Sequence, residues 1–169
     1  MVTPHTHGYF GASTKIALID GHVTTIGDIA ASWTRGVRRY TYSHDDDGRS
    51  MVHLASFNSA RRALFDTQRV LCVTLDDGSV VNCTPAQAFL TDSDTWEPAS
   101  RLKPGQALRT VKDIHLWTWR SSPVDIPVSY DAHRRVAAVS ERKDTLEVFE
   151  FALNKGGSIA HPSGIFLRS

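Results

Sequence analysis

Apolar and polar residues alternate along much of the chain, in short runs that Asp-Gly, Gly and Pro interrupt. Residues 14–26 ("TKIALIDGHVTTI") hold two such runs around Asp20-Gly21, and residues 69–83 ("RVLCVTLDDGSVVNC") hold two more around Asp77-Gly78. Alternation with a period of two is typical of strands that bury one face, and Asp-Gly favours the positive φ angles of a type I′ turn. The pattern therefore predicts two β-hairpins.

The two hairpin sequences resemble each other. Residues 15–23 and 72–80 show the same apolar alternation, closing on the same Asp-Gly turn. A repeat this short also arises by chance, because any exposed hairpin combines alternating apolar residues with a turn. We interpret it as a weak internal repeat, for which the spacing is the stronger indication.

Strand signals also dominate the rest of the sequence. A polar turn at residues 43–50 connects "RRYTY" to "MVHLASF" and predicts a third hairpin, and further strands are expected at residues 107–112, 114–119, 135–140, 146–153 and 164–167. Helical signal is limited to residues 27–33, the turn at residues 85–90, and residues 57–68, where the spacing is helical without a sustained stripe. We predict an all-β domain.

Length and composition favour one domain without a global charge signal. The chain has 169 residues, of which 41% are hydrophobic and 22% charged, and its net charge is +1. No global field attracts nucleic acid or an anionic membrane, and no apolar run approaches the roughly 20 residues of a membrane span. Cys72 and Cys83 form no CxxC pair or disulfide framework, which favours a reducing compartment. We expect a soluble, cytoplasmic monomer with a tail at residues 1–8 and a single domain at residues 9–169.

The order of these segments resembles the Hint module shared by inteins, the processing domain of hedgehog proteins and related bacterial autoprocessing domains. Three blocks carry the resemblance, at residues 9–29, 75–108 and 146–169. The middle block is the most specific, because it has a strand, Asp-Gly, a strand, "TPAQ", Trp96 and then a Leu-x-x-Gly at residues 102–105. The resemblance implies a flat, curved horseshoe of β-hairpins, with pseudo-twofold symmetry and both ends of the module at its centre.

The resemblance also implies a chemistry for which key residues are missing. The family attacks the carbonyl that precedes a Cys or Ser, but Tyr9 stands at that position, and Ser13 is out of register. The family's Thr-x-x-His donates a proton to the scissile amide nitrogen. Here the motif runs from Thr84 to Gln87, and glutamine has no titratable proton although it forms hydrogen bonds.

The C-terminal block departs from the family in the same way. Arg168-Ser169 stands where the family has His-Asn, and serine cannot form the succinimide that releases the C-terminal flank. Arginine is permanently protonated and cannot act as a base. A variant intein class uses a Cys in this block instead, but Glu150 occupies that position. His161 lies about three residues from the place where the family often has a histidine, and we interpret it as a possible relic.

The remaining candidate residues favour ordinary roles, and we expect no metal and no cofactor. Cys72 and Cys83 fit buried strand positions, His5 and His7 a solvated tail, and His44 with the three aspartates that follow it a polar turn. The gap between the second and third blocks is too short for an endonuclease segment. A phosphate-contacting face remains an alternative for a set of basic and aromatic residues: Arg35, Arg38, Arg39, Arg61, Arg62, Arg134, Arg135, Arg142, Lys143, Trp33, Tyr40, Tyr42, Trp117 and Trp119.

These observations lead to one hypothesis and two alternatives. The hypothesis is an endonuclease-free, intein-like Hint module that no longer splices and is now structural or binding, with flanking polypeptide segments as its partners if it is embedded in a host. Its site positions are Tyr9, Thr84, Gln87, Arg168 and Ser169. The first alternative is partial self-cleavage of the peptide bond beside Tyr9 or Ser169, and the second is a β-rich nucleic-acid-binding module.

Overall fold

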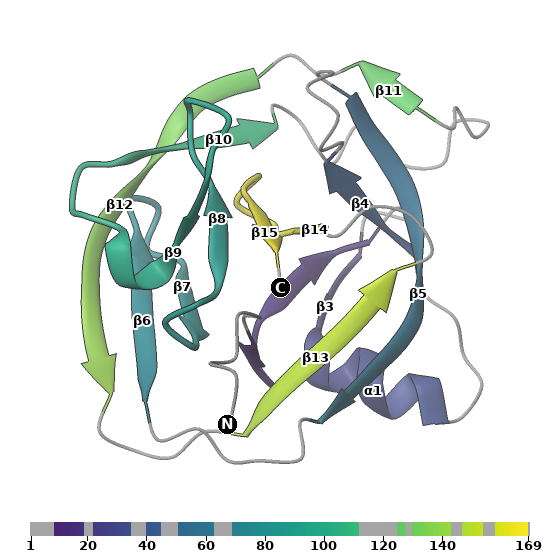
Figure 1. The fold of residues 1–169 in the computed structure, drawn as a ribbon. Coiled ribbons are helices and arrows are strands. Elements are labelled where there is room, and N and C mark those ends of the chain that lie inside the picture. Colours follow the sequence, from purple (N-terminus) through teal and green to yellow (C-terminus); the bar gives the residue numbers. More distant parts are fainter. Residues whose placement is uncertain are drawn as a thin grey trace, which may run out of the picture.

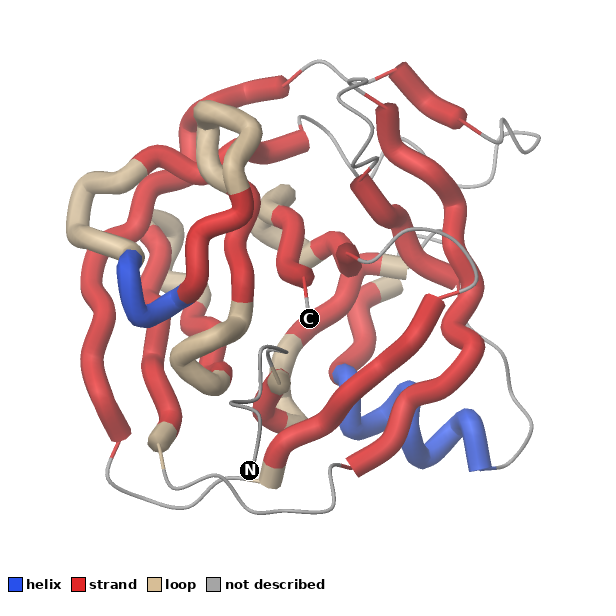
Figure 2. The backbone as a smooth tube through the Cα atoms, viewed as in Figure 1, coloured by secondary structure: helices blue, strands red, loops and turns tan. Residues whose placement is uncertain are grey.

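The computed structural model describes residues 9–18, 22–34, 40–44, 51–62, 69–111, 125–127, 130–142, 147–153 and 158–168. These segments are mostly strands, with one α-helix and one short 3-10 helix, η1 (Figures 1 and 2). The elements are β1 (Phe10–Gly11), β2 (Lys15–Ala17), β3 (Val23–Thr25), α1 (Ile26–Thr34), β4 (Tyr40–His44), β5 (Met51–Arg62), β6 (Val70–Leu75), β7 (Val80–Cys83), β8 (Ala88–Leu90), β9 (Trp96–Pro98), η1 (Ala99–Arg101), β10 (Ala107–Val111), β11 (Asp125–Pro127), β12 (Tyr130–Arg142), β13 (Val148–Leu153), β14 (Ser158–Ala160) and β15 (Phe166–Arg168).

Antiparallel pairing links these strands into three sheets. The largest has the order β10-β12-β6-β7-β1-β13-β5-β11, with β4 also on β5. The second has the order β14-β15-β8-β9, and the third is the β2-β3 hairpin. Figure 1 shows β6, β7, β8, β9, β10 and β12 on one side of the molecule, β4, β5, β13 and α1 on the other, and β15 between them. The predicted all-β fold is confirmed, and its C-terminal strand lies near the centre.

The two predicted repeats are related in structure as well as in sequence. Ile16 pairs with Thr24 and Ala17 with Val23 in the first hairpin, as Val73 pairs with Val81 and Thr74 with Val80 in the second. Burial matches too, because Val23 is 46% and Val80 49% exposed, whereas Ile16 and Val73 are fully buried. The matching register and the burial of Ile16 and Val73 support the interpretation of the two hairpins as a weak internal repeat.

The turn of the second hairpin differs from the predicted type I′. Gly78 has φ of +85°, but Asp77 does not have a positive φ. The Gly78 N–H donates to the Leu75 carbonyl at 3.0 Å, and the Leu75 N–H donates to the Ser79 carbonyl at 2.8 Å. The loop is therefore one residue longer than a type I′ loop, with glycine in the left-handed position that ends it.

One of the three helical predictions is confirmed. Residues 27–33 lie within α1, where the Thr25 hydroxyl accepts a hydrogen bond from the Asp28 N–H at 3.2 Å and caps the helix. The other two predictions are wrong where the chain is described. Residues 57–62 belong to β5, which pairs with β13 and β4, and residues 88–90 form β8. In both segments, pairing with neighbouring strands overrides a weak local preference.

The predicted third hairpin is confirmed by the pairing of β4 with β5. The strands expected at residues 107–112, 135–140, 146–153 and 164–167 correspond to β10, β12, β13 and β15, whereas residues 114–119 lie outside the described segments. No helix in the described part of the chain has the length and apolar character needed to cross a membrane. The division between residues 1–8 and the domain stays a prediction, because those residues also lie outside the described segments.

The buried apolar residues of the described segments form a hydrophobic core. Phe10, Phe57 and Phe151 are buried together, with ring centroids of Phe151 at 5.4 Å from Phe10 and 5.8 Å from Phe57. These rings come from β1, β5 and β13, so they join strands from distant parts of the sequence. Because Phe10 follows Tyr9 directly, the core fixes the backbone at the first candidate site residue.

Candidate functional site

The Thr84–Gln87 turn connects β7 to β8 and is held rigidly. Pro85 presets the backbone angle of the second turn position, and the Gln87 N–H donates to the Thr84 carbonyl at 3.1 Å. The Ala99 N–H donates to the Gln87 carbonyl at 2.7 Å, and the Ser100 N–H donates to the Pro85 carbonyl at 3.1 Å. Main-chain bonds on two sides therefore fix the directions of the Thr84 and Gln87 side chains.

Thr84 binds the main chain of Tyr9. The Tyr9 N–H donates to the Thr84 hydroxyl at 2.9 Å, and the Thr84 N–H donates to the Tyr9 carbonyl at 3.1 Å. The pair extends the β1-β7 ladder, in which Phe10 opposes Cys83. The Tyr9 nitrogen belongs to the peptide bond with residue 8, so Thr84 contacts the bond at which the Hint resemblance implies cleavage.

Gln87 binds the other end of the site. Its side chain is fully buried, and its Nε2 donates to the Ala88 carbonyl at 3.1 Å and also to the Arg168 carbonyl. Its Oε1 is buried without a hydrogen-bond partner among the described residues. A side chain from the middle of the chain therefore contacts the carbonyl of the Arg168–Ser169 peptide bond.

Arg168 is also held through its side chain. Its guanidinium carbon lies 5.5 Å from the centroid of the Trp96 ring, a distance typical of a cation-π contact. Both residues lie on strands that pair with β8, since Arg168 opposes Ala88 and Trp96 opposes Leu90. Trp96 is thus a site residue whose partner the sequence did not indicate.

Ser158 is a second residue that the sequence reasoning missed. It is fully buried and lies directly opposite Arg168 in the β14-β15 pair. The sequence places His161 about three residues from the position where the Hint family often has a histidine. Ser158 is the residue three positions before His161. That displacement was the signal that could have identified this position.

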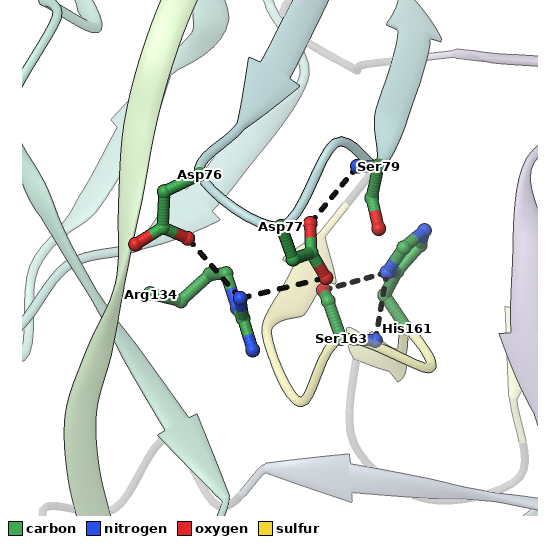
Figure 3. Close-up of polar contacts among 6 residues, drawn as sticks. All are labelled: Asp76, Asp77, Ser79, Arg134, His161 and Ser163. Atoms are coloured by element: carbon green, nitrogen blue, oxygen red, sulfur yellow. Dashed lines mark hydrogen bonds and ion pairs between the residues drawn. The ribbon is translucent and has the colours of Figure 1, made fainter.

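His161 lies at the turn end of the β14-β15 hairpin, about 10 Å along the strand from the level of Arg168. Its Nδ1 accepts a hydrogen bond from the Ser163 N–H at 3.1 Å and lies 2.7 Å from the Ser163 hydroxyl (Figure 3). Nδ1 is an acceptor in this arrangement, so the neutral ring carries its proton on Nε2. The possible relic therefore stabilises a turn and does not lie beside Arg168.

The surroundings of His161 keep its ring neutral. Burial lowers the pKa of His161 to about 4; the charge of Asp77 opposes this shift, and Lys15 and Arg134 add to it. The pKa of Asp77 is itself lowered: burial alone raises it, but hydrogen bonds from Ser79 and the charges of Arg134 and His161 outweigh burial. Arg134 reaches Asp76 at 3.2 Å and Asp77 at 3.5 Å (Figure 3). Through the charges of Asp77 and Arg134 that act on His161, the turn between β6 and β7 interacts with the turn between β14 and β15.

The cysteines have the structural role that their strand positions predicted. Cys83 is fully buried and Cys72 half-buried, and neither forms a disulfide. Burial, with a smaller contribution from Cys72, raises the pKa of the Cys83 thiol, so this group is not a thiolate near neutral pH. The Cys72 thiol donates to the Asn82 side-chain oxygen at 2.8 Å.

Several other candidates have limited or no structural description. Ser169, His5 and His7 lie outside the described segments, as do the aspartates that follow His44. Within the described segments, no three His, Cys, Asp or Glu side chains are grouped so that they could hold a metal ion. Of the basic residues in the nucleic-acid alternative, Arg134 is engaged with the two aspartates of the β6-β7 turn.

Comparison with known proteins gives a clear result for the fold alone. No family profile and no curated protein sequence matches the chain. Among solved structures, a DnaB intein from Synechocystis sp. PCC 6803 is similar, with a TM-score of 0.67 and 16% identity over 96% of this chain and 99% of that one. The TvoVMA intein gives a TM-score of 0.69 and 17% identity, covering 95% of this chain and 97% of that one. A bacterial intein-like domain from Clostridium thermocellum gives 0.67 and 14%, covering 95% and 98%.

These similarities extend over nearly the whole length of both chains. The protein therefore has the fold of inteins, the Hint fold.

Proposed function

We propose that this protein is an endonuclease-free Hint module that no longer splices and now serves as a structural or binding unit for the polypeptide that flanks it. The observation that carries the proposal is the Gln87 side chain, which is fully buried and donates to the Arg168 carbonyl. A carboxamide positions a carbonyl group but has no proton to transfer at neutral pH.

The two end positions support the same proposal. A phenol cannot reach the carbonyl before its own residue through the compact ring that Cys or Ser forms, so Tyr9 cannot start an acyl shift. At the other end, Arg168 is permanently protonated and stacks on Trp96, and serine at residue 169 cannot cyclise as asparagine does. Each step that the Hint chemistry needs lacks its reacting group, while contacts to the main chain remain.

The direct test is a fusion of the chain between two unrelated domains of different mass. Intact mass is followed over a day, with and without dithiothreitol, while circular dichroism reports folding. We expect the fusion to keep its full mass under both conditions. Cleavage or ligation of the flanks by the unmodified chain would refute the proposal and establish the alternative of partial self-processing beside Tyr9 or Ser169.

A variant that restores the missing groups provides the positive control. Tyr9→Cys combined with Gln87→His supplies a thiol nucleophile and a titratable group at the two positions around Thr84. We expect thiol-dependent cleavage before residue 9 in this variant, because the Thr84 contact to the Tyr9 nitrogen is a main-chain contact and survives the substitution. Gln87→His alone has no nucleophile and is the matched inactive control.

Binding to nucleic acid is tested on the same protein. The alternative requires affinity for DNA or RNA that falls steeply with salt concentration. We expect no such binding, because Arg134 is already paired with Asp76 and Asp77, and the net charge of the chain is only +1.

A further inference from the structure

The Gln87 carboxamide has one hydrogen-bonding group without a partner among the described residues, Oε1, and the nitrogen of the same amide binds the Arg168 carbonyl at the end of β15. Nε2 donates to the Ala88 and Arg168 carbonyls, so turning the amide over would set Oε1 against two carbonyl oxygens. The orientation is therefore fixed, and Oε1 remains a buried acceptor without a partner among the described residues. A buried acceptor without a donor destabilises a protein, so this atom indicates a ligand with an N–H.

The main chain of Arg168 defines where such a donor would come from. Arg168 is held at its side chain by Trp96 and at its carbonyl by Gln87, so the last main-chain group before Ser169 has a fixed position beside the carboxamide. In an extended chain, the carbonyl of one residue and the N–H of the second residue after it point to the same side. A carboxamide presents a donor and an acceptor side by side, so its nitrogen can bind the carbonyl while its oxygen accepts from the N–H on the same side of the strand.

We propose that Gln87 and Trp96 form a binding site for the polypeptide segment that continues beyond Arg168, held as an extended strand, with Gln87 Oε1 accepting the main-chain N–H of the second residue after Arg168. Recognition is through main-chain groups, so the side chains of the bound segment are not selected. The inference rests on the proposed function, because the bond between Arg168 and Ser169 has to stay intact. It assigns Gln87 to the C-terminal flank, whereas Thr84 of the same turn holds the N-terminal one.

The test uses the whole chain joined after Ser169 to a short unrelated peptide of mixed sequence, with hydrogen exchange of single amides measured by NMR. We expect the amide of the second residue after Arg168 to exchange about tenfold or more slowly than in the free peptide. Gln87→Leu should abolish this protection, and Gln106→Leu is the matched control. Gln106 lies in a different turn, where its Oε1 accepts from the Lys103 N–H at 3.2 Å, so its replacement should leave the protection unchanged.

A second variant keeps the test decisive if Gln87→Leu does not fold. Proline as the second residue after Arg168 removes the N–H and leaves the module untouched. We expect trypsin to cut after Arg168 about tenfold faster in this variant than when proline is placed two residues further along, because local opening limits the cleavage.

The two proposals fail in different ways. Loss of flank mass without protease refutes the proposed function. Full mass with an unprotected amide, or equal trypsin rates for the two proline positions, refutes the binding site for the C-terminal segment and leaves the proposed function standing.

Discussion

The side-chain nitrogen of Gln87 donates a hydrogen bond to the main-chain carbonyl of Arg168, although 81 residues separate them in the sequence. Three positions before Gln87, the Thr84 hydroxyl accepts from the Tyr9 N–H. One short turn therefore holds the start and the end of the module. Both contacts are hydrogen bonds to main-chain groups, so neither depends on the side chain of Tyr9 or Arg168.

Gln87→Glu tests the donor role of the carboxamide. A carboxylate oxygen in place of Nε2 would face the Ala88 and Arg168 carbonyls in a fully buried position. We expect the free energy of unfolding to fall by about 3 kcal/mol at neutral pH, as measured by urea denaturation. Part of the loss should be recovered near pH 5, relative to the unmodified protein, because protonation restores a donor.

Gln106→Glu is the control for this substitution. The oxygen that accepts from the Lys103 N–H is retained, so stability should change by only about 0.5 kcal/mol. An equal loss in both variants would show that the effect of Gln87→Glu comes from added charge and not from the lost donor.

His161 should make the protein less stable as the pH falls. The pKa of His161 is lowered from its ordinary value of 6.5 to about 4 in the folded state. Between pH 6.5 and pH 4 the unfolded state therefore binds more protons than the folded state. The free energy of unfolding keeps its full value above pH 6.5. It falls by about 3 kcal/mol at most as the pH decreases toward 4. Urea denaturation at a series of pH values measures the slope.

His161→Asn removes the titration but keeps the turn. The asparagine oxygen replaces Nδ1 as acceptor for the Ser163 N–H, so the variant should lose less stability than the unmodified protein over the same pH range. Lowering of the Asp77 pKa acts in the same direction but at lower pH, and the variant keeps the contributions of Ser79 and Arg134 to it and loses only the smaller one of His161. Parallel stability curves would show that His161 does not cause the slope.

The contact between Arg168 and Trp96 should contribute a small, measurable coupling. A double-mutant cycle with Arg168→Met and Trp96→Leu is expected to give about 0.5–1 kcal/mol from urea denaturation. The methionine keeps most of the apolar part of the arginine side chain, so the cycle measures the interaction free energy between the guanidinium charge and the Trp96 ring. Additive effects would mean that the guanidinium gains nothing from Trp96.

Gly78 tests the observed turn geometry. Its φ of +85° disfavours a side chain, while an added Cβ would meet no atom within 4 Å. Gly78→Ala should therefore lower the free energy of unfolding by about 1 kcal/mol through the backbone alone. Gly78→Asn should lower it less, because asparagine tolerates the left-handed region better than alanine. Equal losses from the two substitutions would contradict this explanation.

The fold was largely predictable, because period-two alternation and Asp-Gly turns are local signals. They indicated the hairpins formed by β2-β3, β4-β5 and β6-β7, and the ordered blocks indicated their arrangement. The strand over residues 57–62 was missed because its pairing with β13 lies far away in sequence. Likewise, the extra loop residue before Gly78 depends on backbone angles that an Asp-Gly pair does not fix.

The candidate site was only partly predictable. The sequence identified Thr84 and Gln87 as positions of a motif, but the atom that each side chain binds follows from sheet pairing across the molecule. Trp96 and Ser158 come into the site because β8 lies between β9 and β15, and because β14 pairs with β15. Such non-local neighbours leave no local periodicity in the sequence.

The arrangement of Thr84 and Gln87 has a thermodynamic consequence for any protein that carries this module in one of its loops. An unstructured insertion of the same length would add loop-closure entropy that grows with the logarithm of its length. Because one turn holds both Tyr9 and Arg168, the folded module presents its host with two attachment points at a fixed separation. The host then closes a loop whose effective length is set by this separation and not by the number of residues in the module.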